Sequence, residues 1–270
     1  RDGVDVLARA GHRVPETWDE LLELARAGLV AFAGLKLDCL MLWYALCINE
    51  GEEPFLRPQG IVAQDIGAAA LQDVRALVQA CGTDCMLRNP IANYEQMTSG
   101  DTFGYSPFSY GYSNYARPSY VRTPLQFGGL VQRKGRRMTS TLGGAGLAIS
   151  SRCAHIELAA DYARFAASEP VQRGLYTESG GQPGHRAAWL DDETNRLTGN
   201  FFRNTLQTLD ESYLRPRYAG YIEFQERAPA VLQRCMQGEA TVKQTLQELD
   251  RLDREVRRSR VDERHTSTAA

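Results

Sequence analysis

The chain has 270 residues, which is long enough to bury the cores of one or two domains. Apolar residues make up 43% of it and charged residues 24%, a composition typical of soluble globular proteins. The formal net charge of -2 gives no reason to expect a nucleic-acid partner, and no run approaches the ~20 apolar residues that a membrane-spanning helix needs.

Helix signals dominate residues 1–100. Thr17 and Glu20 have the T-x-x-E spacing of a capping box, which predicts a helix start. Pro90 predicts the start of another helix, which Gly100 ends. Between them the sequence predicts a short strand, a strongly apolar buried helix and an amphipathic helix, at Val30–Ala33, Asp38–Ile48 and Asp65–Ala80.

Short strands are predicted in the middle of the chain, where apolar or aromatic residues lie between turn residues. They cover Thr102–Tyr110, Leu125–Val131 and Met138–Leu142. The last two enclose the densest basic cluster, Arg133–Arg137. We interpret this cluster as a solvated hairpin loop rather than a binding site.

The stretch Thr141–Trp189 combines glycine-rich loops with regular elements. A turn at Gly143–Gly146 leads into the short apolar strand Leu147–Ile149. An amphipathic helix follows, and a second helix begins near Pro170 and ends at the Ser179–Gly181 turn. This arrangement can present backbone amides to a ligand, and it contains no evident nucleophile or metal set.

The remaining residues are predicted to be helical, at Asn200–Leu209, Tyr221–Met236 and Thr241–Val256. Pro229 is expected to kink or break the second of these helices. Residues 257–270 are charged and then small and polar, and we expect a flexible tail. Helices that separate short strands point to an α/β architecture.

The six cysteines and four histidines have no metal-binding spacing. Cys81 and Cys85 are three residues apart and lack a second cysteine pair or a nearby histidine. They are either buried small side chains or, in an oxidising compartment, a local disulfide. No metal or cofactor is expected.

Several segments resemble one known family. The "GLAIS", "FAASEPVQ" and "GGQPGHRAAW" segments of Thr141–Trp189 are similar to the extracellular solute-binding proteins, family 1, of bacterial ABC importers. The sugar-binding, maltose-binding-protein-like type is the most similar. The resemblance continues, in the family's order, at Val14–Leu22 ("VPETWDELL"), Tyr94–Asp101 and Arg215–Tyr221.

The resemblance implies a periplasmic binding protein type II-like fold with two α/β lobes. Residues 1–140 and 187–256 would form the C-terminal lobe, and residues 141–186 would be a returning segment of the N-terminal lobe. The chain starts at Arg1 without a signal peptide, so we expect most of the N-terminal lobe to be missing. In that case the apolar strand and helix face of residues 141–186 would be exposed or repacked.

The resemblance also implies a function without chemical turnover. Such a protein captures a carbohydrate or similar polar solute between its lobes and closes about a hinge. It then delivers the solute to the membrane permease of an ABC transporter. The intact protein would be a periplasmic, or an extracellular lipid-anchored, monomer, and neither a nucleic-acid binder nor an enzyme.

The same resemblance suggests which residues bind the ligand. Five of the twelve tyrosines lie between Tyr105 and Tyr120, and a tyrosine ring can stack on a sugar while its hydroxyl bonds the sugar edge. A tyrosine-rich loop packed on its own lobe is the alternative. The candidates are Trp43, Tyr110, Ser113, Asn114, Gly143, Gly144, Arg215 and Tyr218.

Several candidates have a structural alternative. Trp43 is either an aromatic platform or a core residue. Gly143 and Gly144 either let a ligand approach the backbone or form a turn with positive φ. Arg215 either binds sugar hydroxyls or a carboxylate, or forms a surface salt bridge.

Two other functions stay open at this point. The chain would be a small α/β hydrolase or transferase if Ser150 or Ser151, or a carboxylate near the tyrosines, had a catalytic partner. It would be a non-functional truncated binding protein if no further lobe is encoded upstream.

Overall fold

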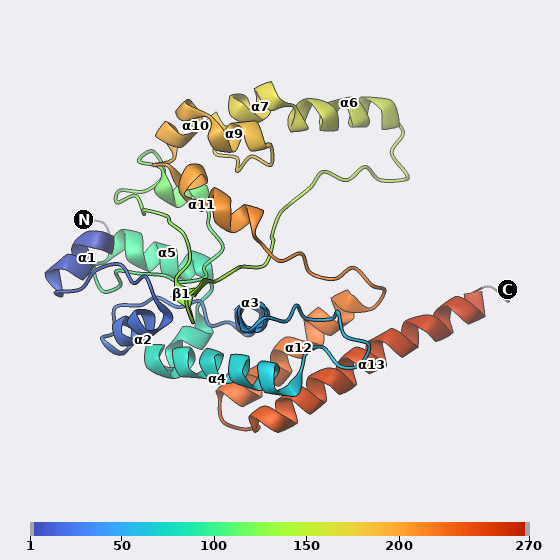
Figure 1. Ribbon diagram of the computed structural model, residues 1–270. Helices are drawn as coiled ribbons and strands as arrows, with labels where there is room; N and C mark the ends of the chain where they lie inside the picture. The colour runs from blue at the N-terminus through green and yellow to red at the C-terminus, as the bar shows by residue number, and fades with distance from the viewer. Residues whose placement is uncertain (1–2, 268–270) are drawn as a thin grey trace.

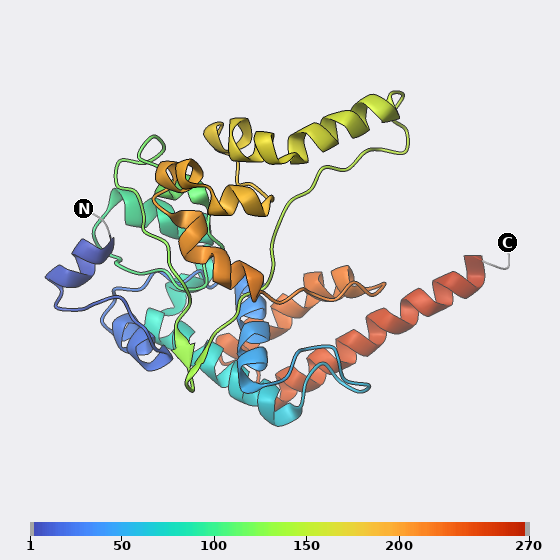
Figure 2. The ribbon, with the colours of Figure 1, turned by 45° about the horizontal axis from the view of Figure 1, so that its top comes forward.

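The computed structural model describes residues 3–267, with side chains up to residue 258. Its lower body, as drawn in Figures 1 and 2, is a stack of helices around the main hydrophobic core. The helices that contact one another here are α2 (Trp18–Arg26), α3 (Lys36–Glu50), α4 (Gln64–Cys81), α12 (Tyr221–Met236) and α13 (Val242–Ser267). Helix α3 is at the centre because ten of its residues are buried, which leaves it almost no solvent-facing side.

Above the body lie smaller helices that carry the opposite wall of the cavity described below. Helices α6 (Ile156–Ala167), α7 (Glu169–Arg173), α9 (Arg186–Leu190) and α10 (Asp192–Leu197) form an arm in Figure 1. We call residues 151–197 the arm. Between arm and body lie α1 (Gly3–Arg9), α5 (Pro90–Ser99), α11 (Phe201–Asp210) and the 3₁₀ turn η2 (Ser113–Ala116); the remaining short helices are η1 (Thr83–Leu87) and α8 (Leu175–Glu178).

The capping signals of the sequence are confirmed. Thr17 accepts a hydrogen bond from the amide of Glu20, and the Glu20 carboxylate accepts one from the amide of Thr17, so α2 begins with a capping box. Helix α5 spans Pro90–Ser99 as predicted, with Asn89 as the N-cap. The fold is a helix-rich α/β arrangement.

The C-terminal helices differ from the prediction in two respects: α12 lacks the break that was one of the two effects expected of Pro229, and the expected tail is largely helical. Helix α12 continues through Pro229 without a break, and Pro229 is buried within it. Helix α13 runs to Ser267, so residues 257–267 of the expected tail are helical, and residues 268–270 lie outside the described part. Among residues 3–267, no helix is both long and apolar enough to cross a membrane.

The predicted strands are much shorter than the sequence suggests. Only β1 (Gln132–Arg133) and β2 (Arg136–Arg137) form a ladder among the described residues, and they are antiparallel. The expected strands at Val30–Ala33 and Thr102–Tyr110 meet in a single parallel bridge between Val30 and Tyr105. A strand needs a neighbour to complete its backbone hydrogen bonds, and this chain supplies few neighbours.

The segment of residues 142–150 shows this lack of neighbours most clearly. In Figures 1 and 2 it runs alone and extended from the body to α6. Leu142 is bonded to Tyr213, but no strand is assigned in residues 142–150, and Leu147 and Ile149 are exposed. Helix α6 contains no buried residue, although its apolar residues have helical spacing. The exposed helix face that we expected is therefore present, whereas the predicted strand Leu147–Ile149 is an exposed segment without strand pairing.

The basic hairpin is confirmed, but one of its arginines is not solvated. Lys134 and Gly135 form the turn with positive φ, as a two-residue hairpin requires. Arg133 is 7% exposed and its guanidinium forms ion pairs with Glu50, at 2.5 Å, and with Asp73. The hairpin is thus tied to helices α3 and α4 by a nearly buried cation.

Candidate functional site

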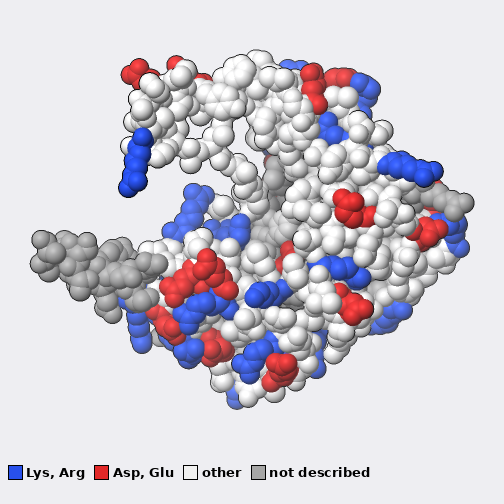
Figure 3. All heavy atoms as spheres, turned by 180° about the vertical axis from the view of Figure 1, so that it is seen from behind, with Lys and Arg blue, Asp and Glu red and all other residues white. Residues whose placement is uncertain are grey.

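A cavity of about 1920 Å³ lies between the arm and the body. Figure 3 shows the wide opening beneath the arm, viewed from behind. The body side of the cavity is formed by residues 104–112, 125–130 and 140–147, and its far side by α6, α7 and α8. The loop of residues 182–185 and helix α11 complete the wall. Segments distant in the sequence therefore meet around one space.

Aromatic rings face this cavity from both sides. Tyr110 and Tyr112 line it from the body, and the arm contributes Tyr162, Tyr176 and, from α9, Trp189. The indole N–H of Trp189 donates to the Pro183 carbonyl at 2.8 Å, which fixes its ring at the wall. Flat apolar faces with polar edges suit a ligand that has both apolar and hydroxyl-bearing surfaces.

The polar part of the wall is almost entirely uncharged. Among the described lining residues, Asp210 is the one carboxylate and His185 the one basic side chain. Arg186 donates to both Asp210 oxygens, at 2.6 and 2.9 Å, and these bonds lower the Asp210 pKa. The other polar lining side chains are hydroxyls and amides of Ser106, Ser109, Gln126, Ser140, Thr141, Gln172, Ser179, Gln182, Thr205, Thr208 and Ser212. The one carboxylate on the described wall, Asp210, is thus already paired with a cation, Arg186.

Tyr110, one of the predicted ligand residues, lines the cavity. Its hydroxyl shares a hydrogen bond with the Thr141 hydroxyl, which joins the tyrosine-rich passage to the glycine segment. Burial raises the Tyr110 pKa to about 12, so this hydroxyl stays protonated near neutral pH and remains able to donate. Thr141 was not among the predicted residues, because a lone threonine before a glycine turn has no distinctive signal.

The glycines at 143, 144 and 146 also line the cavity. None of the three has a positive φ, so the expected alternative role as a left-handed turn is wrong. A Cβ atom on Gly144 or Gly146 would meet nothing within 4 Å, and one on Gly143 would meet only Tyr110, at 3.9 Å. Nothing within the described chain requires glycine here, which leaves the backbone open to a ligand or another polypeptide.

The other predicted ligand residues lie outside the cavity lining. Trp43 is fully buried in the main core, and its indole N–H donates to the Gly67 carbonyl at 3.1 Å. Arg215 donates to the Gln225 side chain at 2.6 Å. Tyr218 donates to Asp253 and lies under the Arg257 guanidinium. Trp43 is thus a core residue, the alternative considered for it, whereas Arg215 bonds an uncharged amide rather than the carboxylate of a surface salt bridge.

Ser113 and Asn114 lie just behind the wall. The Ser113 amide donates to the Gln182 side chain at 3.1 Å, and the Gln182 amide donates to the Gly111 carbonyl at 3.2 Å. Gln182 lines the cavity, whereas Ser113 itself is 1% exposed. The backbone of Ser113 therefore helps to position Gln182 at the cavity wall.

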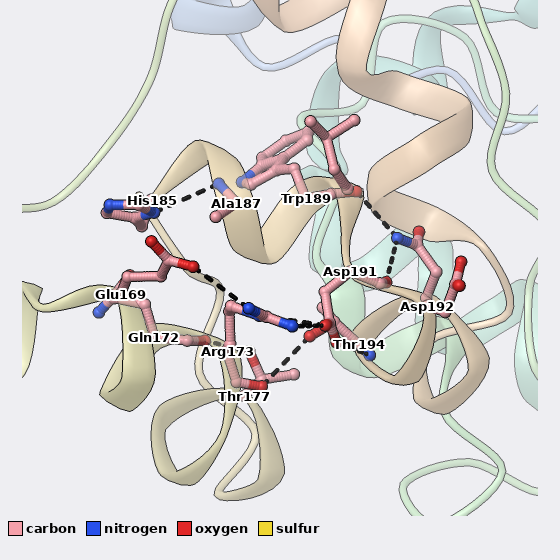
Figure 4. Close-up of polar contacts among 12 residues, drawn as sticks. Glu169, Gln172, Arg173, Thr177, His185, Ala187, Trp189, Asp191, Asp192 and Thr194 are labelled. Carbon is pink, nitrogen blue, oxygen red and sulfur yellow. Dashed lines mark hydrogen bonds and ion pairs between the residues drawn. The ribbon is translucent and has the colours of Figure 1, made fainter.

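Polar contacts rather than a large core shape the arm near the cavity (Figure 4). Gln172 is 7% exposed; its side chain donates to the Ala166 carbonyl and accepts from the Gly184 amide. Arg173 bridges Glu169 and Asp191, and Asp191 also caps α10 by accepting from the Thr194 amide. These bonds hold the 182–185 loop against the helices of the arm.

The serines considered as nucleophiles have ordinary surroundings. Ser150 accepts a hydrogen bond from the Arg152 amide, and both Ser150 and Ser151 are exposed. Neither hydroxyl is bonded to a histidine or carboxylate within the described part of the chain. In residues 3–267, no group of three or more His, Cys, Asp or Glu side chains is arranged to hold a metal.

Comparison with solved structures identifies the fold. Maltose-bound T. maritima MalE3 superposes with a TM-score of 0.75 at 19% identity, and covers 93% of this chain and 68% of its own. The ribitol complex of an Agrobacterium radiobacter K84 ABC transporter solute-binding protein gives 0.72 at 17% identity, with 94% and 67% covered. The Thermotoga lettingae TMO solute-binding protein with α-D-tagatose gives 0.72 at 20% identity, with 94% and 68% covered.

The chain therefore spans about two thirds of the length of each of these structures. No family model matches the sequence, and no curated protein matches it significantly. The similarity is thus one of structure at low identity. The chain has the fold of the type II periplasmic binding proteins.

Proposed function

We propose that this chain is part of the substrate-binding component of an ABC transporter, of the family 1 extracellular solute-binding type. It captures a carbohydrate or similar polar solute in the cavity between arm and body, and delivers it to a membrane permease. The protein acts in the periplasm, or outside the cell on a lipid anchor, as a monomer without a cofactor. The maltose, ribitol and tagatose bound to structures of the same fold support a sugar or polyol.

The observation that carries the proposal is the combination of aromatic rings and uncharged polar groups around the cavity. An ionic solute would need a counter-charge in this space, because burying an unpaired charge is costly. Asp210 is already paired with Arg186, and no lysine or arginine lines the described wall. A neutral, hydroxyl-rich solute meets the wall without an unpaired charge.

We further propose that residues 141–186 belong to a second lobe. Residues 1–140 and 187–256 form the first. The exposed side chains of α6 support this division, since Ile156, Leu158, Tyr162 and Phe165 are all more than half exposed. An apolar helix face of this kind is normally covered. The larger part of that lobe would lie outside residues 1–270, so this chain offers one part of the ligand cleft and binds its solute weakly.

A screen with matched solutes tests the charge argument. Saturation-transfer NMR on residues 1–270 would compare neutral mono- and oligosaccharides and polyols with charged counterparts, for example glucose with glucuronate and glucosamine. We expect signals from neutral solutes with millimolar affinity, and weaker or no signals from the charged counterparts. A charged solute that binds more tightly than its neutral counterpart would overturn the proposal.

A further inference from the structure

Three of the six cysteines meet around one short segment of the body, Phe32–Gly34. The Cys39 thiol donates to the Gly34 carbonyl at 3.3 Å. The Phe32 amide bonds the Cys81 sulfur. Gly34 donates to the Cys85 carbonyl at 3.0 Å, and a Cβ on Gly34 would lie 2.9 Å from the Cys85 sulfur. The Cys85 sulfur therefore packs directly on this segment.

The chain between Cys81 and Cys85 makes a tight reversal. Cys81 is the last residue of α4, Gly82 has a φ of 79°, and the 3₁₀ turn η1 then contains Cys85. The Cys85 amide donates back to the Gly82 carbonyl at 3.1 Å. This turn brings the two cysteines close together, and the nearby Cys85 thiol adds to burial in raising the Cys81 pKa.

Access distinguishes Cys81 from the other two thiols. The connecting residues 82–84 are exposed and Cys81 is half-buried, whereas Cys85 and Cys39 are fully buried. Burial raises the pKa of Cys81 to about 12 and that of Cys85 to about 11, with Arg88 lowering both in opposition. Both thiols therefore react slowly, and the half-buried Cys81 is the one that an oxidant reaches first.

We propose that Cys81 and Cys85 form a disulfide that fastens the end of α4 to η1 over the Phe32–Gly34 segment. A small-molecule or protein disulfide is the oxidant. One cysteine thiolate attacks it and releases a thiol, and the second thiolate then attacks the mixed disulfide and releases the other thiol. Two protons and two electrons leave the protein in this exchange.

The disulfide also stabilises the part of the cavity wall that is hydrogen-bonded to the neighbouring residue Ala31. The Ala31 carbonyl, next to the fastened segment, accepts bonds from the Ser106 hydroxyl at 2.7 Å and from the Asn93 amide at 2.9 Å. The Ala31 amide donates to the Tyr105 carbonyl at 2.8 Å. Tyr105 and Ser106 both line the cavity, so a fixed 32–34 segment fixes part of its wall. The inference depends on the proposed function in one respect: a periplasmic or extracellular protein meets the oxidising conditions in which a disulfide persists.

Peptide mapping tests the disulfide without any solute. Residues 1–270 would be incubated with oxidised glutathione, alkylated and digested with trypsin. Cleavage after Arg75 and Arg88 gives one peptide that holds only these two cysteines, while Cys39 falls in another peptide, after Lys36. We expect the 76–88 peptide to be unalkylated and lighter by two hydrogen atoms than its dithiol form.

Single-cysteine variants show how much the Cys81–Cys85 disulfide raises the melting temperature. Oxidation should raise Tm by roughly 4 °C, the effect of closing a short loop. Cys85→Ala and the milder, half-buried Cys81→Ser should both remove this rise, and Cys153→Ala, in the arm, should leave it unchanged. Full alkylation of both cysteines after oxidation, or a link from Cys85 to the Cys39 peptide, would overturn the inference. Neither result bears on solute binding.

Discussion

Replacing Arg133 with alanine is expected to lower the free energy of unfolding by about 3–5 kcal/mol. The Arg133 guanidinium lies between Glu50 and Asp73 and also donates to Asn49 at 3.0 Å. Removing the cation leaves Asp73 and Glu50 near each other with little water to stabilise them, although Glu50 keeps its ion pair with the exposed Lys134. Urea denaturation of wild type and variant, followed by circular dichroism, measures the loss.

Arg136→Ala is the matched control, because this arginine belongs to the same hairpin and its side chain is exposed. It should change stability by less than about 0.5 kcal/mol. A loss below about 1 kcal/mol for Arg133→Ala would show that the network contributes little.

The same network predicts a pH dependence. Burial acts to raise the Glu50 pKa, but Lys134 and Arg133 outweigh it, and the pKa is lowered from 4.5. A carboxylate with a lowered pKa in the folded state contributes stability above its unfolded pKa and loses it as pH falls through the folded value. The difference in stability between wild type and Glu50→Gln should therefore be full near pH 7 and shrink below about pH 4.5.

Trp43→Ala is expected to cost about 3–5 kcal/mol. The ring is completely buried, packs beside Tyr44 with centroids 5.6 Å apart, and donates its N–H to Gly67. Truncation leaves a large hole and an unsatisfied carbonyl in the centre of the body. Thermal and chemical denaturation would measure the loss.

Trp43→Phe separates a core role from a ligand role. We expect it to reduce stability by less than the alanine variant and to leave solute affinity unchanged, since Trp43 does not line the cavity. A selective loss of solute binding in a stably folded Trp43→Phe protein would restore the interpretation of Trp43 as a ligand platform.

The helices could be predicted because their signals are local. The capping box at Thr17, the proline at Pro90 and the amphipathic spacing of α4 act within a few residues of chain. The strands depend on neighbours that are distant in the sequence, and their apolar residues alone did not reveal that 142–150 has no strand partner.

The site was predictable only in part, for the same reason. Tyr110 and the glycines at 143 and 144 belong to distinctive local patterns, and they line the cavity. Trp43 and Tyr218 have equally distinctive side chains, but tertiary packing buries the first and pairs the second with Asp253. The burial of Arg133 within a basic hairpin likewise depends on Glu50 and Asp73, which lie far away in sequence.

The central claim is that a neutral solute binds against the glycine segment in a cleft of which this chain supplies one part. The most direct test titrates the strongest neutral solute of the screen into wild type, Gly144→Leu and Ser151→Leu. Nothing in the described chain lies within 4 Å of a Cβ on Gly144, so the leucine fills ligand space without disturbing the fold, and Ser151 is exposed and outside the cavity. We predict millimolar dissociation constants for wild type and Ser151→Leu and no detectable binding for Gly144→Leu. Equal affinity in Gly144→Leu, or micromolar affinity in wild type, would contradict this account.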